Sequence, residues 1–260
     1  MCFDLDSHPP IAPIAGGALD STRLTLTADD GNPFAAYRAR AAVPTGAGMI
    51  VLPDVRGLHP YYEELALRFA EHGVDALAID YFGRTAAAEP RDESFEFMPH
   101  VGQTTWAGLS ADIRAAAEDL RSPVGGSVRS LFTIGFCMGG RLSFLAATLG
   151  MDIAGAIGFY GWPTGPARND TPAPADVAGA MEGGVLGIFG GADQGIDASV
   201  VGAFEAALVA AGVDHRLITY PGAPHSFFDR KATEFATASG AAWAEILAFI
   251  QARTESAATG

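Results

Sequence analysis

The sequence predicts an α/β protein with a mostly parallel central sheet, helices on both faces and an antiparallel hairpin at the N-terminal edge. Two observations lead to this fold class. Short apolar runs, typical of strands buried on both faces, alternate with helical segments over most of the chain. Ahead of them, the segments 23–27 and 34–39 flank a turn at 29–32, which is typical of a hairpin.

The later strands and helices follow in alternation. The predicted strands are apolar and short, and they span 48–54, 74–80, a run that begins at 130, 153–161, 184–190 and 215–220. The predicted helices carry periodic apolar residues, and they span 61–71, 104–121, a segment that begins near 141, 199–211 and 232–251. The connection 81–102 is predicted to be a long loop, and a structureless loop of that length is usually functional. The connection 162–176 holds many prolines and is also predicted to be a loop.

We expect residues 1–260 to form a single domain. The sequence has no internal repeat and no linker-like segment, and its length suffices for one large core. Residues 1–18, rich in Pro and Gly, are expected to form an extended arm over the surface. Residues 252–260 are small and polar, and we expect a flexible tail there.

A possible nucleophile lies between the strand that begins at 130 and the helix that follows it. The sequence there reads Gly135-Phe136-Cys137-Met138-Gly139-Gly140, a strand, a sharp turn and then a helix. This is the context of a nucleophile elbow with cysteine in the serine position, and the glycines allow the tight bend. A helix N-terminus stabilises a thiolate. The alternative is a buried structural cysteine beside a glycine-rich turn.

Polar residues follow the ends of several predicted strands, namely Asp54, Asp80, Cys137, Asp193 and His225. Carboxyl ends of parallel strands meet at one edge of a sheet, so these side chains should gather there. The chain order Cys137, Asp193, His225 is that of an α/β-hydrolase triad, with histidine as base and aspartate as its orienting partner. Taken singly, the histidine fits a structural loop residue and the aspartate fits a helix cap.

Together these segments resemble the dienelactone hydrolase family, from about Leu24 to Phe249. The motifs are the elbow, the stretch 190–193, the histidine segment 225–227, and two further segments at 53–58 and 80–84. The resemblance implies the α/β-hydrolase fold and no metal or cofactor. It also implies hydrolysis of an ester or lactone, dienelactone-like and bearing a carboxylate, through an acyl-cysteine.

The resemblance also implies roles for residues around the triad. Backbone N–H groups of Met138 and Val55 would form the oxyanion hole, because fixed donors suit a developing charge. Arg84 matches a family arginine that binds the substrate carboxylate, and its guanidinium is suited to bidentate contact. The alternative for Arg84 is a solvated loop charge. Tyr160 would contribute to the pocket wall, or pack in the core.

Two departures from the family pattern concern the substrate. Asp54 stands where the family prototype has a glutamate, and it could instead cap the turn after its strand. Asp229 stands where the prototype has a second arginine, so either the carboxylate clamp is weaker or Arg230 serves from a shifted loop. Arg56 is a further candidate for the mouth of the pocket.

Charge and cysteine content limit the class of partner. A net charge of −14 argues against nucleic acid or an anionic membrane surface as partner, and it says nothing specific about a small-molecule substrate. Two cysteines give no disulfide framework, no apolar run reaches membrane-spanning length, and the first residues lack a signal-peptide pattern. We therefore expect a cytoplasmic protein, either a monomer or a small homo-oligomer.

Two other functions remain open from the residues alone. A thioesterase or acyltransferase can use the same triad, since fold and triad do not decide the substrate. A ligand-binding or redox-sensing protein without catalysis could carry a merely reactive Cys137.

Overall fold

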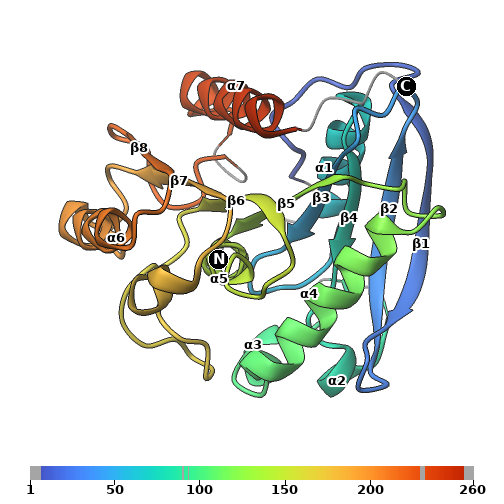
Figure 1. Ribbon diagram of the computed structural model, residues 1–260, viewed down its shortest axis with the longest axis horizontal. Helices are drawn as coiled ribbons and strands as arrows, with labels where there is room; N and C mark the ends of the chain where they lie inside the picture. Colours follow the sequence, from blue (N-terminus) through green and yellow to red (C-terminus); the bar gives the residue numbers. More distant parts are fainter. Residues whose placement is uncertain (1–6, 90, 93, 229–231, 255–260) are drawn as a thin grey trace.

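The computed structural model describes residues 7–89, 91–92, 94–228 and 232–254, and its centre is an eight-stranded sheet (Figure 1). The strand order is β1-β2-β4-β3-β5-β6-β7-β8. The pairs β1–β2 and β2–β4 are antiparallel, and the remaining neighbours are parallel, which confirms the predicted fold class. The bounds are β1 Ala18–Thr27, β2 Pro33–Ala41, β3 Ala47–Leu52, β4 Asp75–Ile79, β5 Ser130–Phe136, β6 Ile153–Phe159, β7 Gly184–Gly190 and β8 His215–Tyr220.

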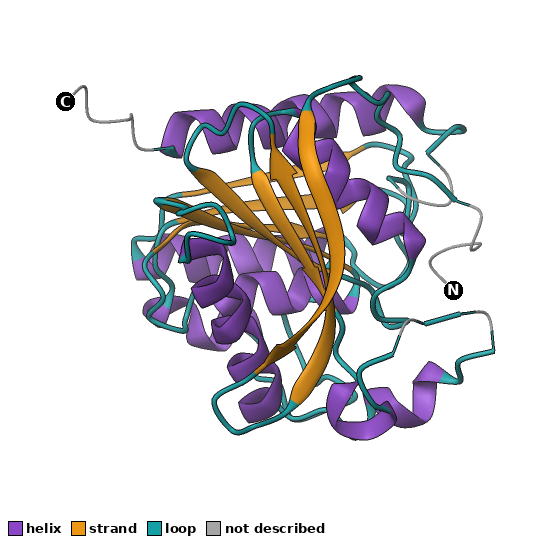
Figure 2. Cartoon of the chain, turned by 90° about the vertical axis from the view of Figure 1, so that its right-hand side faces the viewer, coloured by secondary structure: helices purple, strands orange, loops and turns teal. Residues whose placement is uncertain are grey.

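Helices cover both faces of this twisted sheet (Figures 1 and 2). Helices α1 and α7 lie on one face, where the ring of Phe69 contacts that of Trp243 at 5.0 Å between centroids. Helices α4, α5 and α6 lie on the other, where Phe144 contacts Phe204. The bounds are α1 Pro60–Glu71, α2 Gly83–Ala86, α3 Phe97–Val101, α4 Trp106–Arg121, α5 Met138–Ala146, α6 Ala198–Ala211 and α7 Ala236–Arg253, with a 3₁₀ helix at Pro174–Ala180.

Several predicted boundaries were wrong, each for a local reason. Strand β1 begins at Ala18 rather than 23, because its exposed edge position leaves Asp20-Ser21-Thr22 without the alternation that marks a half-buried strand. The connection 81–102 contains α2 and α3, which are too short to show helical periodicity. Helix α7 continues to Arg253, which stacks on Phe249, so the tail begins later than 252; residues 255–260 lie outside the described part.

The order of the parallel strands creates a crevice at the carboxyl ends of β3 and β5. From β3 the chain passes through α1 to β4 on one side, whereas from β5 it passes through α5 to β6 on the other. Ligands bind at such a switch point, because the two connections diverge and leave the strand ends uncovered. Val55 and Cys137 follow these two strand ends.

Glycines allow α5 to begin in close contact with the sheet. A Cβ atom on Gly135 would lie 1.9 Å from the carbonyl oxygen of Gly139, and one on Gly139 would lie 2.0 Å from that of Leu52. Both contacts are with backbone, which cannot turn aside as a side chain could. The first turn of α5 is therefore held against the end of β3, beside Pro53.

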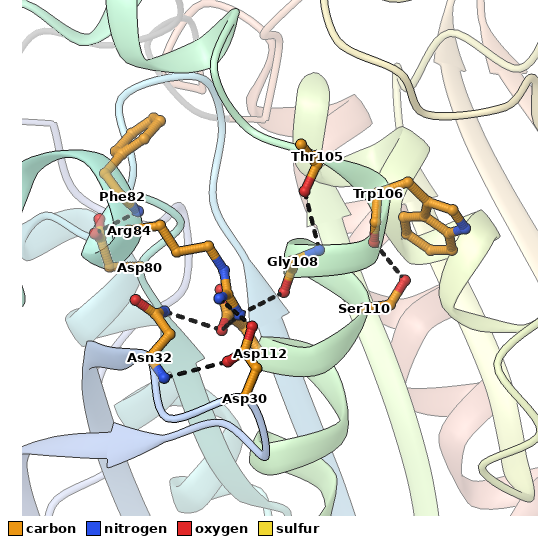
Figure 3. Close-up of polar contacts among 10 residues, drawn as sticks. All are labelled: Asp30, Asn32, Asp80, Phe82, Arg84, Thr105, Trp106, Gly108, Ser110 and Asp112. Carbon is orange, nitrogen blue, oxygen red and sulfur yellow. Dashed lines mark hydrogen bonds and ion pairs between the residues drawn. The ribbon is translucent and has the colours of Figure 1, made fainter.

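An ion-pair network ties the first hairpin to α2 and α4 (Figure 3). The guanidinium of Arg84 binds the carboxylates of Asp30 and Asp112 and donates to the carbonyl of Gly108. Asn32 also donates to Asp112, at 3.2 Å. The side chain of Asp112 is only 1% exposed, and burial raises its pKa to about 6 despite the neighbouring Arg84.

We predict that Gly135→Ala destabilises the fold by roughly 3 kcal/mol or more, because its Cβ would collide with a carbonyl that has no room to move. The matched control is Gly202→Ala in α6, where an added Cβ meets nothing within 4 Å. That control should gain about 0.5–1 kcal/mol from lower backbone entropy in the unfolded chain. Urea unfolding followed by circular dichroism measures both; equal stabilities would contradict the close approach.

We predict that Asp112→Asn becomes more stable relative to wild type as pH rises from 4 to 7. The folded pKa of about 6 lies above the ordinary value of 3.8, so folded Asp112 keeps a proton that the unfolded chain has lost. Wild-type stability should therefore fall across this range, by roughly 3 kcal/mol relative to the asparagine variant. The measurement is the difference in unfolding free energy at each pH.

The control for that experiment is Asp30→Asn in the same network. The hydrogen bond from Arg84 lowers the pKa of Asp30, so this variant should not gain stability as pH rises. A pH-independent difference between wild type and Asp112→Asn would refute the assignment of a raised pKa.

Candidate active site

Cys137 lies on the sharp turn between β5 and α5. Its backbone has φ 55° and ψ −113°, a conformation that is strained for a residue with a side chain and is a common feature of functional turns. The amide of Cys137 donates to the carbonyl of Phe159 at 3.0 Å, which fixes the turn against β6. The residue is 8% exposed and lies at the N-terminus of α5, where the helix dipole favours a thiolate.

His225 and Asp193 form a hydrogen-bonded pair beyond the ends of β8 and β7. His225 Nδ1 lies 2.7 Å from Asp193 Oδ2, and Asp193 Oδ1 accepts from the amides of Gly195 at 2.9 Å and Ile196 at 3.3 Å. Burial alone would raise the pKa of Asp193, but His225 and the two amides outweigh it and lower that pKa. The ionised carboxylate of Asp193 accepts a hydrogen bond from His225, so Nδ1 of the imidazole carries the hydrogen and Nε2 is the basic nitrogen.

Two aromatic side chains fix the ring of His225. Tyr160 contacts it at 4.7 Å between centroids, and Trp162 contacts it at 5.0 Å. Tyr160 is fully buried and has a positive φ of 36°, so a second strained residue follows β6 at the same edge of the sheet. These contacts restrict the imidazole to one orientation beside Asp193.

A cavity of about 400 Å³ opens at the switch point between β3 and β5. Cys137, Val55 and Met138 line it together. The roles that the resemblance implies for them, a nucleophile and two amide donors, stay predictions. Trp162 lines the same cavity and contacts His225, which joins the Asp193–His225 pair to this site. The other described lining residues are Val101, Arg141, Leu142, Pro166, Ala167, Arg168, Asn169 and Thr171.

The two strand-end carboxylates, Asp54 and Asp80, are fully buried just beyond the ends of β3 and β4, and neither is among the described residues that line the cavity. Asp54 Oδ1 accepts from the amide of Arg56 at 2.9 Å, which is the turn-capping contact considered from sequence. Asp80 accepts from the amides of Leu58 and Phe82 and forms an ion pair with Arg91 at 2.8 Å. These carboxylates hold the turn that carries Val55.

Tyr81, which follows β4, is buried beside the same strand ends. Burial raises the pKa of Tyr81 well above its ordinary value, and the charges of Asp54, Asp80 and Cys137 raise it further. The Tyr81 hydroxyl donates to the carbonyl of Pro53 at 2.8 Å.

The structure does not bring every candidate residue to the cavity. Arg84 is held by Asp30 and Asp112, and neither Arg84, Arg56 nor Tyr160 is among the described residues that line it. Arg56 lies in the turn after β3. Burial and then the charge of Arg56 lower the pKa of His59. Asp229 and Arg230 lie outside the described residues.

The sequence did not reveal the cavity wall formed by the loop after β6, which contains Arg168 and is contacted by Arg141. The available signal was position: residues 162–172 follow a predicted strand end at the same edge as Cys137. Among the described residues, no group of three or more His, Cys, Asp or Glu could hold a metal ion. Within the same ranges, no helix combines the length and apolarity needed to cross a membrane.

Comparison of the sequence with known proteins identifies the family of this chain. The dienelactone hydrolase family model matches residues 34–254. A Rhodococcus opacus carboxymethylenebutenolidase is 28% identical over 234 residues, which are 87% of this chain and 86% of the relative. A Salmonella typhimurium protein, named provisionally for the same activity, is 30% identical over 228 residues, or 85% of this chain and 80% of that protein.

Comparison with solved structures leads to the same family. A crystal structure from Klebsiella pneumoniae, provisionally named a dienelactone hydrolase, superposes with a TM-score of 0.77 at 26% identity and covers 89% of this chain and 98% of that one. With the family model spanning most of the sheet and the strand-end residues in place, this chain belongs to the dienelactone hydrolase family.

Proposed function

We propose that this chain hydrolyses an ester or lactone through an acyl-cysteine, with Cys137 as nucleophile, His225 as base and acid, and Asp193 as orienting partner. One observation carries the proposal. A histidine whose Nδ1 is bound to a buried carboxylate at 2.7 Å lies beside a cavity lined by a cysteine at a helix N-terminus. These are the parts that nucleophilic acyl transfer requires.

Acylation would begin with proton transfer from Cys137 Sγ to His225 Nε2. The thiolate attacks the carbonyl carbon, and the carbonyl π electrons move to its oxygen. The amides of Met138 and Val55 would donate to this oxyanion, and the contact of Gly139 with Leu52 supports their placement side by side. The tetrahedral intermediate collapses, the C–O bond breaks, and the leaving oxygen takes the proton from His225. A lactone leaving group stays tethered to the acyl chain.

Deacylation would reverse these roles with water. His225 Nε2 takes a proton from the water molecule as its oxygen attacks the thioester carbon. The second intermediate collapses, the carboxylic acid leaves, and the sulfur recovers its proton or remains a thiolate. Asp193 stays ionised throughout, since its pKa is lowered, and it holds the imidazolium that forms twice in each cycle.

Asp54 and Arg84 take supporting places in this proposal. Asp54 would fix the turn that presents the Val55 amide, since it caps the amide of Arg56. Arg84 is left out of the substrate contacts, because Asp30 and Asp112 already hold its guanidinium.

We predict that Cys137→Ala lowers kcat/KM for a 4-nitrophenyl ester by at least ~10³-fold, since it removes the nucleophile. Acid-quenched mass spectrometry should find the acyl group on the Cys137 peptide and not on Cys2, the other cysteine of the sequence. An acyl group on another residue, or full activity in the variant, would refute the assignment.

We predict that Asp193→Asn lowers kcat by roughly 10²–10⁴-fold while the protein stays folded. An asparagine oxygen can still accept from Gly195 and Ile196, but its amide cannot accept the Nδ1 hydrogen of His225. Asp197→Asn is the matched control, because Asp197 only caps α6. Equal activities of the two variants would remove Asp193 from the mechanism.

A further inference from the structure

Trp162 places an indole ring between the cavity and the imidazole of His225. It lines the cavity, and its ring centroid lies 5.0 Å from that of His225, with the two planes inclined at 38°. The residue is 37% exposed, although a ring of this size gains most when it is buried. Specific contacts, rather than burial alone, therefore hold the ring in this place.

Arg141 ties the backbone of Trp162 to the helix that begins after Cys137. Arg141 lies in α5, and its amide donates to the carbonyl of Cys137 at 3.2 Å. The residue is 5% exposed, and its Nη1 donates to the carbonyl of Trp162 at 3.0 Å. Its Nη2 donates to carbonyls farther along the same loop, which keeps the guanidinium from turning away. The position of Trp162 is thus set from the helix of the elbow.

The indole ring is also tied to the turn that carries Asp193. Indole Nε1 donates to the carbonyl of Gly195 at 3.2 Å, and the amide of Gly195 donates to Asp193 Oδ1 at 2.9 Å. The ring lies directly against this glycine, because a Cβ atom on Gly195 would be 2.6 Å from Cζ2 of Trp162. One side chain therefore contacts the imidazole and, through a single residue, the carboxylate that orients it.

A link of this kind matters because the residues proposed for catalysis follow different strands. Cys137 comes after β5, Asp193 after β7 and His225 after β8, and the order in the sheet is β5-β6-β7-β8 (Figure 1). Neighbouring strands lie about 4.8 Å apart, so roughly 14 Å separates β5 from β8. The loop after β6 leaves the sheet between them, where Trp162 is bound to α5 on one side and to the turn after β7 on the other.

We propose that Trp162 is a positioning residue that sets the imidazole of His225 against the thiol of Cys137, with Arg141 holding it in place. This rests on the hydrolase function proposed above and extends its machinery to the loop after β6. An aromatic face at 5.0 Å also favours the imidazolium over the neutral ring, because the ring quadrupole attracts a cation. A thiolate–imidazolium pair is thereby stabilised on its cationic side.

Three titratable groups act on the imidazole in the proposed mechanism. Asp193 after β7 binds Nδ1 with a carboxylate whose pKa is lowered, and Tyr160 after β6 contacts the ring at 4.7 Å. Cys137 after β5 is the proposed proton donor to Nε2. A substitution of Trp162 leaves all three groups in the chain. A changed ionisation of Cys137 in such a variant would therefore report a loss of position rather than the loss of a charge.

The test uses substitutions that alter the indole ring from two sides. Trp162→Leu removes the aromatic face, and Trp162→Phe keeps a ring but lacks both the N–H group and Cζ2. Gly195→Ala leaves Trp162 in the chain and crowds its ring. Trp106→Leu is the matched control, because it removes an indole at the start of α4 that is not among the described lining residues. Circular dichroism and urea unfolding establish that each variant is folded.

Trp162→Leu should lower kcat for a 4-nitrophenyl ester by roughly 10–100-fold, with a smaller change in KM, because a misplaced base transfers the proton poorly. Trp162→Phe should keep kcat within about fivefold of wild type. Gly195→Ala should lower kcat by roughly tenfold alone, yet change it little in combination with Trp162→Phe, which has no Cζ2 for the added methyl group to meet. Trp106→Leu should match wild type.

Alkylation of Cys137 by iodoacetamide, followed on its peptide by mass spectrometry, gives a second readout that measures the thiolate without turnover. Trp162→Leu should lower the ratio of the rate at pH 6 to the rate at pH 9 by roughly fivefold, because the thiolate at pH 6 needs its imidazolium partner. A residue that merely covers the cavity would, when shortened, raise both rates and leave their ratio unchanged.

An unchanged ratio in Trp162→Leu, or additive effects of Gly195→Ala and Trp162→Phe on kcat, would overturn the inference while leaving the hydrolase function intact. A wild type that hydrolyses neither lactones nor activated esters would instead overturn the hydrolase function. The alkylation ratio would then still decide whether Trp162 sets the imidazole against the thiol, since it needs no substrate.

Discussion

The close approach of α5 to the end of β3 is the constraint on which the candidate site depends. Gly139 lies against the carbonyls of Leu52 and Pro53, and Gly135 lies against Gly139 itself. Only backbone without Cβ atoms can pack this tightly, so the strained turn at Cys137 is held between a strand and a helix that cannot separate. The strain at one residue is balanced by the packing of two core elements.

The fold and the composition of the site could be predicted from the sequence because their signals are local. Buried strands appear as apolar runs, and Cys137, Asp193 and His225 each follow such a run directly. Parallel topology then brings their positions to one edge, whatever the details of packing. The positions of Val55 and Met138 beside Cys137 came instead from the resemblance to a family, and both residues line the cavity with Cys137.

What the sequence could not reveal depends on partners that are distant along the chain. Arg84 resembles a ligand-binding arginine in its segment, but its partners Asp30 and Asp112 lie 54 and 28 residues away. The short helices α2 and α3 and the first residues of strand β1 lack periodicity, because none of these segments has one face buried along its length. Whether an arginine binds substrate or forms an internal ion pair thus depends on which carboxylates lie beside it in the tertiary structure.

The bonds of Arg141 have a consequence for how this family member can diverge. The guanidinium holds the loop after β6 through main-chain carbonyls, which every amino acid possesses. This part of the loop's anchorage is therefore independent of side chains such as Pro166, Ala167 and Arg168, which line the cavity, whereas the elbow tolerates almost no replacement. Substitutions in the loop after β6 can change the shape and polarity of one wall of the cavity while the wall that carries Cys137 stays unchanged. Substrate preference can therefore diverge within the family without a change in the residues proposed for catalysis.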